Sequence, residues 1–299
     1  MMIQIVLCIC TATTVAALGY LIVQIRAGWR MVRELSHPKR AAAPNVSDFD
    51  CSVRFFRFAS TYRRSLSAVV YEPRAATKRR GTILAFHYLG GSKTSIYPYV
   101  KSLIDHGYRV VSFDYPNHGE SDDSPSSRYT LETDVRYFLA ALRHNGIDGP
   151  YGAIGFSMGA SLALAAADLE PQIRAVALDS GPLLDARRYF YRVLDGKREK
   201  RPVVRAVFVG CYLFLMGFYS RERKMVRRLK RLRGLPMMYV HGKRDRIIPI
   251  DNARRAYELS KSEFSRFTAV DRAHHLTNRV LLGPQYDQLV LNFFRSWLQ

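Results

Sequence analysis

The chain has 299 residues, of which 48% are hydrophobic and 24% are charged, so it can bury the core of one large domain and is not a disordered chain. Its four cysteines include no CxxC pair and no His/Cys cluster, which argues against a disulfide framework and a zinc site. We expect no metal and no other cofactor. The formal net charge of +21 would suit an acidic partner, either a nucleic acid or an anionic membrane surface.

The N-terminal segment, residues 1–25, contains no Asp, Glu, Lys or Arg. A helix of this length spans about 37 Å, more than the roughly 30 Å of a hydrocarbon core. We therefore predict a transmembrane anchor here, in preference to a cleaved signal peptide, which normally starts with basic residues. Arg26 and Arg30 follow the apolar run, so the positive-inside tendency places the rest of the chain in the cytoplasm. Residues 26–50 are interpreted as a basic linker and 51–299 as the folded domain.

The folded domain begins with two strand-like runs, 51–60 and 64–73, which flank a short turn and predict an antiparallel pair. After them, apolar runs of strand length alternate with stretches of helix length, the pattern of a parallel sheet covered by helices on both faces. These runs are 82–88, 109–115, 151–156, 173–179 and 236–242, with a further one at 267–275. A final amphipathic stretch over 286–299 predicts a closing helix. The chain is therefore predicted to be α/β, with a mostly parallel sheet of eight strands.

A candidate nucleophile lies in the sequence Gly-Phe-Ser-Met-Gly, residues 155–159, where one apolar run gives way to an alanine-rich, helix-forming stretch. The small residues on both sides of Ser157 permit a tight turn that exposes its hydroxyl. A serine hydroxyl becomes a good nucleophile only when a histidine takes its proton and a carboxylate holds that histidine. We predict that Ser157 is the nucleophile; a structural serine in a tight turn is the alternative.

The acid and the base should follow later strands of the sheet. Asp245 lies in the loop after 236–242, where the carboxyl ends of parallel strands carry functional groups. We expect it to be the acid, with Asp179 as the rival position. His274 and His275 follow the last predicted strand, and one of them suffices as the base.

The order Ser157, Asp245, histidine is the chain order of the triads of α/β-hydrolases, and residues 51–299 resemble that superfamily. In that family the catalytic histidine follows a Gly-Ala-Gly-like turn. Laid on the sequence Arg-Ala-His-His, this resemblance implies His275 as the base in preference to His274.

The resemblance also implies an oxyanion hole. The stretch "FHYLGGS" at 86–92 is similar to the family's His-Gly-x-Gly-Gly loop, although Tyr88 replaces the usual glycine. It implies that the backbone N–H groups of Leu89 and Met158 are the two donors to the developing negative oxygen.

A basic insert separates the strand ending at Asp179 from the one beginning at Pro236, in the place where these hydrolases carry a cap, and we expect the cap at about 182–234. From Ala186 to Gly234 it holds 16 Lys and Arg against three acidic residues. Its centre, 203–219, is nearly all apolar, unlike the interleaved stacking residues of nucleic-acid binders, so we expect no nucleic acid as partner. A membrane crossing here would separate Ser157 from its partners. The insert is therefore expected either to pack as an ordinary cap or, as we favour, to lie in the membrane interface with its arginines on anionic head groups.

Taken together, the motifs and the resemblance to membrane-anchored, single-pass α/β-hydrolase-domain esterases imply a membrane-associated serine hydrolase. It would cleave a lipophilic carboxylic ester or thioester through an acyl-enzyme intermediate, with a lipophilic small molecule or a lipid as substrate. Two alternatives are a serine peptidase of the aminopeptidase branch and a catalytically silent membrane scaffold. A lost triad member would favour the scaffold, and each member has a candidate.

Overall fold

The computed structural model describes residues 1–41, 46–73, 80–124 and 131–298, and its centre is one sheet of eight strands. The strands lie in the order β1-β2-β4-β3-β5-β6-β7-β8. β2 pairs antiparallel with both β1 and β4, and all other neighbours are parallel. The strands are β1 (Ser52–Ala59), β2 (Ser65–Glu72), β3 (Gly81–Phe86), β4 (Tyr108–Phe113), β5 (Tyr151–Phe156), β6 (Ile173–Asp179), β7 (Met237–Gly242) and β8 (Arg266–Val270). The predicted α/β fold with a mostly parallel eight-stranded sheet is confirmed.

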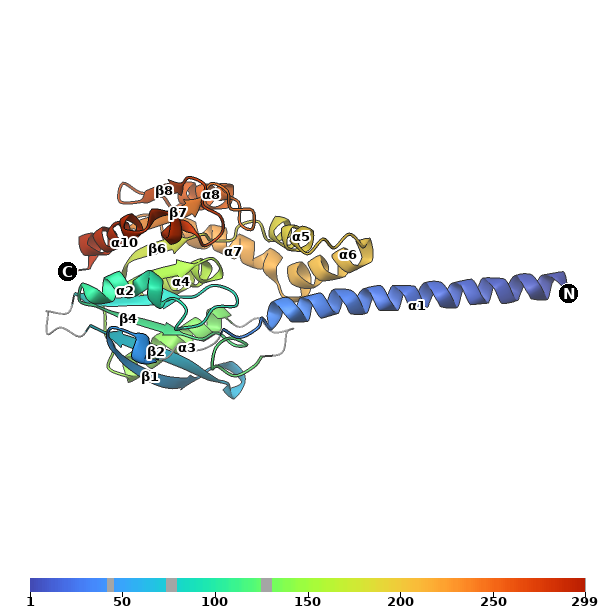
Figure 1. Ribbon diagram of the computed structural model, residues 1–299, viewed down its shortest axis with the longest axis horizontal. Helices are drawn as coiled ribbons and strands as arrows, with labels where there is room; N and C mark the ends of the chain where they lie inside the picture. The colour runs from blue at the N-terminus through green and yellow to red at the C-terminus, as the bar shows by residue number, and fades with distance from the viewer. Residues whose placement is uncertain (42–45, 74–79, 125–130, 299) are drawn as a thin grey trace.

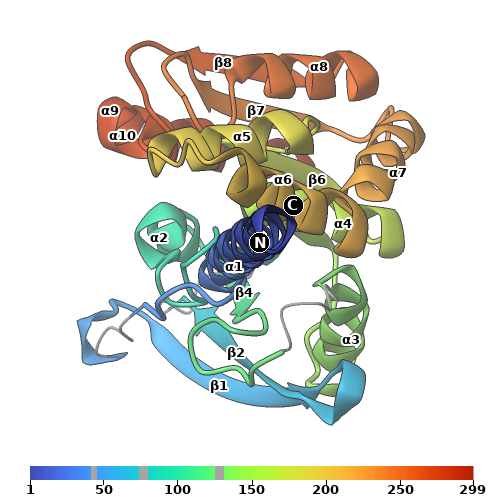
Figure 2. The ribbon, with the colours of Figure 1, turned by 90° about the vertical axis from the view of Figure 1, so that its right-hand side faces the viewer.

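Helices cover both faces of this sheet, because its strands are apolar on both sides. α2 and α10 lie on one face, and α3 and α4 on the other (Figure 2). On the second face Phe138 of α3 and Leu162 of α4 share a core with Phe113 of β4. On the first face Val100 of α2 and Phe294 of α10 belong to a separate core. The helices that follow the first one are α2 (Tyr97–Asp105), α3 (Leu131–His144), α4 (Met158–Leu169), α5 (Ala186–Gly196), α6 (Pro202–Gly210), α7 (Phe218–Arg231), α8 (Ile250–Ser260), α9 (Asn278–Leu282) and α10 (Pro284–Trp297).

The first helix, α1 (Met2–Ser36), is one continuous rod that projects from the body (Figure 1). By length and composition it can cross a membrane. The described side chains from Met1 to Val23 are all exposed, whereas Gln24, Gly28 and Val32 are buried against the rest of the protein. The helix therefore continues eleven residues past the predicted end of the anchor at residue 25, because its second half has a partner to pack against. Residues 42–45 of the predicted linker lie outside the described residues.

That partner is the insert between β6 and β7, which folds as α5, α6, a π-helical turn (Cys211–Leu215) and α7. α6 lies beside the part of α1 nearest the body (Figure 1). Val32 of α1 shares a core with Phe190 of α5, Phe208 of α6 and Tyr212 of the π-helical turn. Phe208, Val209 and Leu213 of the apolar centre are thus buried in the protein, whereas Phe214 is 74% exposed. The interfacial arrangement of the insert stays a prediction.

Two basic residues of α7, Arg228 and Arg231, form ion pairs with acidic residues of neighbouring helices. The guanidinium of Arg228 is only 2% exposed and pairs with Asp168 of α4 at 3.2 Å and with Glu132 of α3 at 3.2 Å. Arg231 pairs with the same Asp168 at 2.6 Å. Both arginines dock α7 on the sheet-covering helices; Arg228 is buried in this contact, whereas 55% of the Arg231 side chain remains exposed.

Candidate active site

Ser157 lies at the tight turn between β5 and α4, with its backbone in an unusual conformation for a non-glycine residue (φ 53°, ψ −111°). Such positions cost free energy and cluster at functional sites. The flanking glycines explain why the turn can form. A Cβ on Gly155 would lie 2.3 Å from the Gly159 carbonyl oxygen, and one on Gly159 would lie 2.1 Å from the Phe86 carbonyl oxygen. The predicted turn is present, and the Ser157 side chain lines a cavity at the carboxyl end of the sheet.

Ser157, His275 and Asp245 are joined by two hydrogen bonds. The Ser157 hydroxyl donates to Nε2 of His275 across 2.8 Å, and Nδ1–H of His275 donates to Oδ2 of Asp245 across 2.7 Å. Ser157 follows β5, Asp245 follows β7 and His275 follows β8. Three strand ends therefore bring together side chains that are 118 residues (Ser157) and 30 residues (Asp245) from His275 in the sequence. The structure brings these predicted residues together in the geometry that a base-activated nucleophile needs.

The carboxylate of Asp245 is held in a fixed orientation and kept ionised. Its Oδ1 accepts hydrogen bonds from the backbone N–H groups of Ile247 and Ile248, each at 2.9 Å. Burial acts to raise the pKa of Asp245, but the hydrogen bonds from His241 and His275 outweigh it, so the pKa lies well below the ordinary value. Asp245 therefore stays a hydrogen-bond acceptor and charge partner for His275 at neutral pH.

The alternative base His274 and the alternative acid Asp179 make other hydrogen bonds. His274 is exposed, and its backbone N–H donates to Thr277. Asp179 is buried, where it accepts hydrogen bonds from Ser180, Asn278 and Tyr286 at 2.6–2.7 Å. Burial raises its pKa above the ordinary value despite these hydrogen bonds.

Asp179 nevertheless supports the site, in a way that the sequence did not reveal. Ser180, which donates to Asp179, also accepts a hydrogen bond from the backbone N–H of Leu276 at 3.1 Å. Because Leu276 directly follows His275, this network holds the loop that carries the base.

The two predicted oxyanion donors belong to residues that line the same cavity as Ser157. Met158 begins α4, and Leu89 lies in the turn after β3. That turn is shaped by His87, whose buried ring stacks on Tyr115 with centroids 3.7 Å apart and lies 2.8 Å from the Tyr88 carbonyl oxygen. Burial lowers the pKa of His87, so its ring is neutral and serves as scaffold.

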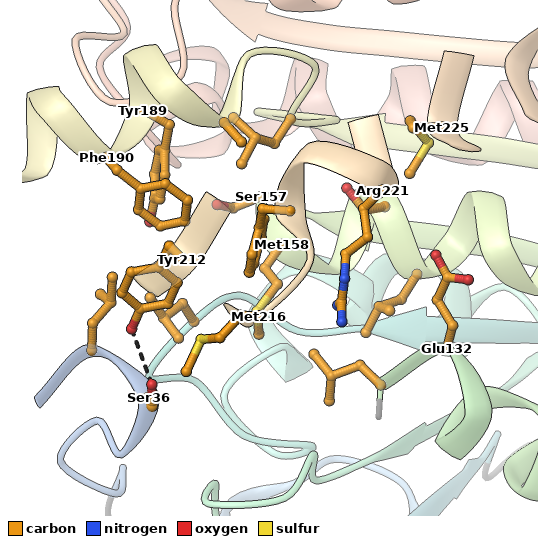
Figure 3. Close-up of a pocket in the computed structure, with 18 of the residues that line it drawn as sticks. Ser36, Glu132, Ser157, Met158, Tyr189, Phe190, Tyr212, Met216, Arg221 and Met225 are labelled. Carbon is orange, nitrogen blue, oxygen red and sulfur yellow. Dashed lines mark hydrogen bonds between the residues drawn. The ribbon is translucent and has the colours of Figure 1, made fainter. Parts of the chain in front are cut away.

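The cavity has a volume of about 170 Å³, and its lining residues lie on both sides of Ser157. Figure 3 shows Tyr189, Phe190 and Tyr212 of the cap on one side. The charged residues Arg221 and Glu132 lie on the other side, together with the apolar Met225. Most of the remaining lining is apolar.

Two lining residues, Leu35 and Ser36, come from the end of α1 and were not predicted as site residues. Both belong to the stretch 26–50 that was predicted to be a basic linker, and their neighbours in the sequence carry no motif. One signal in the sequence could have found them: no proline interrupts the stretch from Gln24 to Ser36, and the first proline of the chain is Pro38, just after the helix ends.

Comparison with known proteins identifies related hydrolases. A family model described as the alpha/beta hydrolase fold matches residues 81–206. The uncharacterized protein YfhR of Escherichia coli O157:H7 is 25% identical over 221 residues, covering 73% of this chain and 71% of YfhR. The sn-1-specific diacylglycerol lipase ABHD11 of Danio rerio is 34% identical over 128 residues, which cover 41% of this chain and 39% of the lipase.

Solved structures with the same fold include the Pyrococcus furiosus esterase Pf2001, with a TM-score of 0.71, 17% identity, and coverage of 88% of this chain and all of that one. At this identity the likeness concerns the fold alone. The family model, the relatives and the fold together identify the chain as a protein of the α/β-hydrolase fold.

Proposed function

We propose that this chain, which belongs to the α/β-hydrolase superfamily, is a membrane-associated serine hydrolase that cleaves a lipophilic carboxylic ester or thioester. The observation that carries the proposal is the pair of hydrogen bonds that links Ser157 through His275 to Asp245 beside a largely apolar cavity. The partial match to a diacylglycerol lipase supports a lipid ester as the substrate class.

The reaction proceeds in two halves, each with a proton transfer through His275. Ser157 Oγ attacks the carbonyl carbon of the ester while its proton moves to Nε2 of His275, and Asp245 stabilises the imidazolium that forms. The backbone N–H groups of Leu89 and Met158 donate to the negative oxygen. His275 then protonates the leaving alcohol or thiol, which leaves an acyl-enzyme. In the second half His275 takes a proton from water while the water oxygen attacks the acyl carbonyl carbon. His275 then returns the proton to Ser157 Oγ as the bond to the acyl group breaks, which releases the acid.

The membrane association in this proposal rests on α1, whose exposed apolar half has the length of a span. Arg26, Arg30 and Arg33 follow that half and are exposed, which favours a cytoplasmic location for the domain. Residues 51–299 form the catalytic domain, with the cap at about 182–234. Protease protection in sealed membrane vesicles tests the orientation. The domain should be digested in vesicles whose cytoplasmic face points outward and protected in vesicles whose cytoplasmic face points inward.

Labelling with a fluorophosphonate tests the chemistry, because an activated serine displaces fluoride from phosphorus. Ser157→Ala should abolish labelling and lower turnover of p-nitrophenyl esters by about 10⁶-fold. The matched control is Ser161→Ala, which removes a hydroxyl from the same cavity one turn along α4. Undiminished labelling of Ser157→Ala, or loss of labelling in Ser161→Ala alone, would contradict the proposal.

The roles of the partners are tested separately. His275→Ala and Asp245→Asn should each lower turnover by about 10⁴-fold or more, and His274→Ala should leave it within about twofold. Turnover of aminopeptidase substrates but not of esters would favour the peptidase. Correct folding with neither labelling nor turnover would favour the scaffold.

A further inference from the structure

The end of α1 is attached firmly to the side of the cavity that the cap aromatics form. The Tyr212 hydroxyl donates to the Val32 carbonyl oxygen at 3.0 Å and lies 3.0 Å from Ser36 Oγ, as the dashed line in Figure 3 shows. The Tyr212 ring stacks on Phe190 with centroids 4.3 Å apart. The last turn of α1 and the aromatic wall of the cap are therefore one packed unit.

The same turn is also attached to the catalytic domain. Asn117, in the loop after β4, donates to the Ser36 carbonyl oxygen at 2.9 Å. Beyond the helix, Arg40 donates to the carbonyl oxygens of His118 at 3.3 Å and Ser121 at 2.9 Å. The last turn of α1 is therefore bonded both to Tyr212 of the cap and to Asn117 of the loop after β4. The position of Leu35 and Ser36 at the cavity does not depend on the cap alone.

The two walls of the cavity suit the two ends of an amphipathic ester. On the α1 side, Leu35, Tyr189 and Phe190 offer carbon surface for a hydrocarbon chain. On the other side, the charged side chains of Arg221 and Glu132 line the cavity. An ester bond held at Ser157 would then have its acyl chain toward α1 and its polar alcohol toward α3 and α7.

We propose that the last turn of α1 is part of the acyl-binding site, with Leu35 limiting the length of the acyl chain that Ser157 accepts. The anchor helix thus both spans the membrane and selects the substrate. This inference rests on the proposed hydrolase function for its catalytic consequence, but the binding site itself can be tested without turnover.

The test changes the size of Leu35 in both directions in the full-length protein in detergent micelles. Leu35→Trp fills the acyl side of the cavity, and Leu35→Ala enlarges it. The same two substitutions at Leu21, an exposed leucine of α1 that is 41% accessible, are the matched controls. One misfit group in an apolar pocket changes discrimination by about 10- to 200-fold.

The first measurement is the ratio of kcat/KM for p-nitrophenyl dodecanoate to that for p-nitrophenyl butyrate. Leu35→Trp should lower this ratio about tenfold or more, Leu35→Ala should raise it, and both Leu21 variants should leave it within about twofold. An unchanged ratio in both Leu35 variants would overturn the inference, and so would equal changes at Leu21.

The second measurement is the binding of dodecanoate to the Ser157→Ala protein, detected as a rise in its melting temperature. This measurement needs no catalysis. Adding Leu35→Trp should weaken binding about tenfold or more, and adding Leu21→Trp should not. Normal binding by the Leu35→Trp protein overturns the inference whatever the enzyme does. Weakened binding together with no labelling or ester turnover by the wild type would uphold the acyl site and contradict the proposed hydrolase.

Discussion

Two long apolar runs of this chain, 2–23 and 203–219, lie in opposite surroundings. Along the first, the described side chains are exposed on a projecting helix (Figure 1). Along the second, Phe208, Val209 and Leu213 are buried in the core that the cap forms with α1. The difference follows from connectivity: the second run lies between β6 and β7, which are neighbours in one sheet, so both its ends must return to the same place. Apolar length alone therefore does not identify a membrane span.

The largest effect is expected within the buried run. Phe208→Ala removes a fully buried ring and should destabilise the protein by about 3–5 kcal/mol, because it loses burial and leaves a cavity. The matched control is Phe214→Ala in the same cap, where the side chain is 74% exposed and the change should stay within about 0.5 kcal/mol. Urea unfolding followed by tryptophan fluorescence measures both. Equal effects would mean that the apolar centre of the cap is not buried as described.

A charge introduced into the exposed run should weaken membrane insertion without changing the stability of the folded domain. Leu18→Asp places a carboxylate within the exposed half of α1, five residues before its end at Val23, and should disfavour insertion by up to about 2.5–3.5 kcal/mol. The expected result is a larger fraction released from membranes by alkaline extraction, with Leu18→Ile as control. The melting temperature of the solubilised protein should stay the same. A large drop in that temperature would show that this half of α1 packs on the domain.

The two halves of α1 can be compared at their two glycines. A Cβ on Gly28 would lie 2.8 Å from Cβ of Val207 on α6, whereas a Cβ on Gly19 meets no described atom within 4 Å. Gly28→Leu should therefore separate α1 from the cap and cost about 1–3 kcal/mol of stability, and Gly19→Leu should cost none. Thermal unfolding in detergent measures the difference. Comparable losses in the two variants would place the end of the packed half closer to the N-terminus.

The smallest effect concerns the charges that flank the buried run. Lys200, in the turn between α5 and α6, is exposed, and the preceding Lys197 pairs with Glu34 of α1 at 3.0 Å, so this turn lies beside the anchor. Lys230 is equally exposed on α7 but lies near the arginines that dock on α4. In a chain shortened to start at Gln24, Lys200→Gln should weaken binding to acidic liposomes by about 1 kcal/mol, and Lys230→Gln should have little effect.

Salt provides the control for this last prediction. Raising the ionic strength from 0.1 M to 1 M shortens the screening length from about 10 Å to about 3 Å, so binding that depends on Lys200 should fall steeply. The shortened chain begins at Gln24 and not after Ser36, because residues 24–36 pack on the cap and the cavity. If Lys230→Gln has the larger effect, the basic face of α7 is the one that meets the membrane.

The sequence by itself determined the fold class and the identity of the residues that meet at the site. Alternating apolar runs depend on which faces of each strand are buried, and this is a local property of the chain. The turn around Ser157 was predictable because its glycines are required by close contacts within the turn and with the neighbouring strand. Asp245 and the pair His274 and His275 followed from their places after strands, since the carboxyl ends of parallel strands meet at one edge. The choice of His275 within that pair was implied by the resemblance to α/β-hydrolases.

Only the tertiary structure decided which neighbours these segments have. The orientation of His275 toward Ser157, with His274 exposed, depends on a loop held by Ser180 and Asp179 from another strand. The place of Ser36 at the cavity depends on Tyr212, which is 176 residues away in the chain. Charge and apolarity are properties of each residue, but burial depends on what packs against it, and contacts between such distant segments leave no local pattern in the sequence.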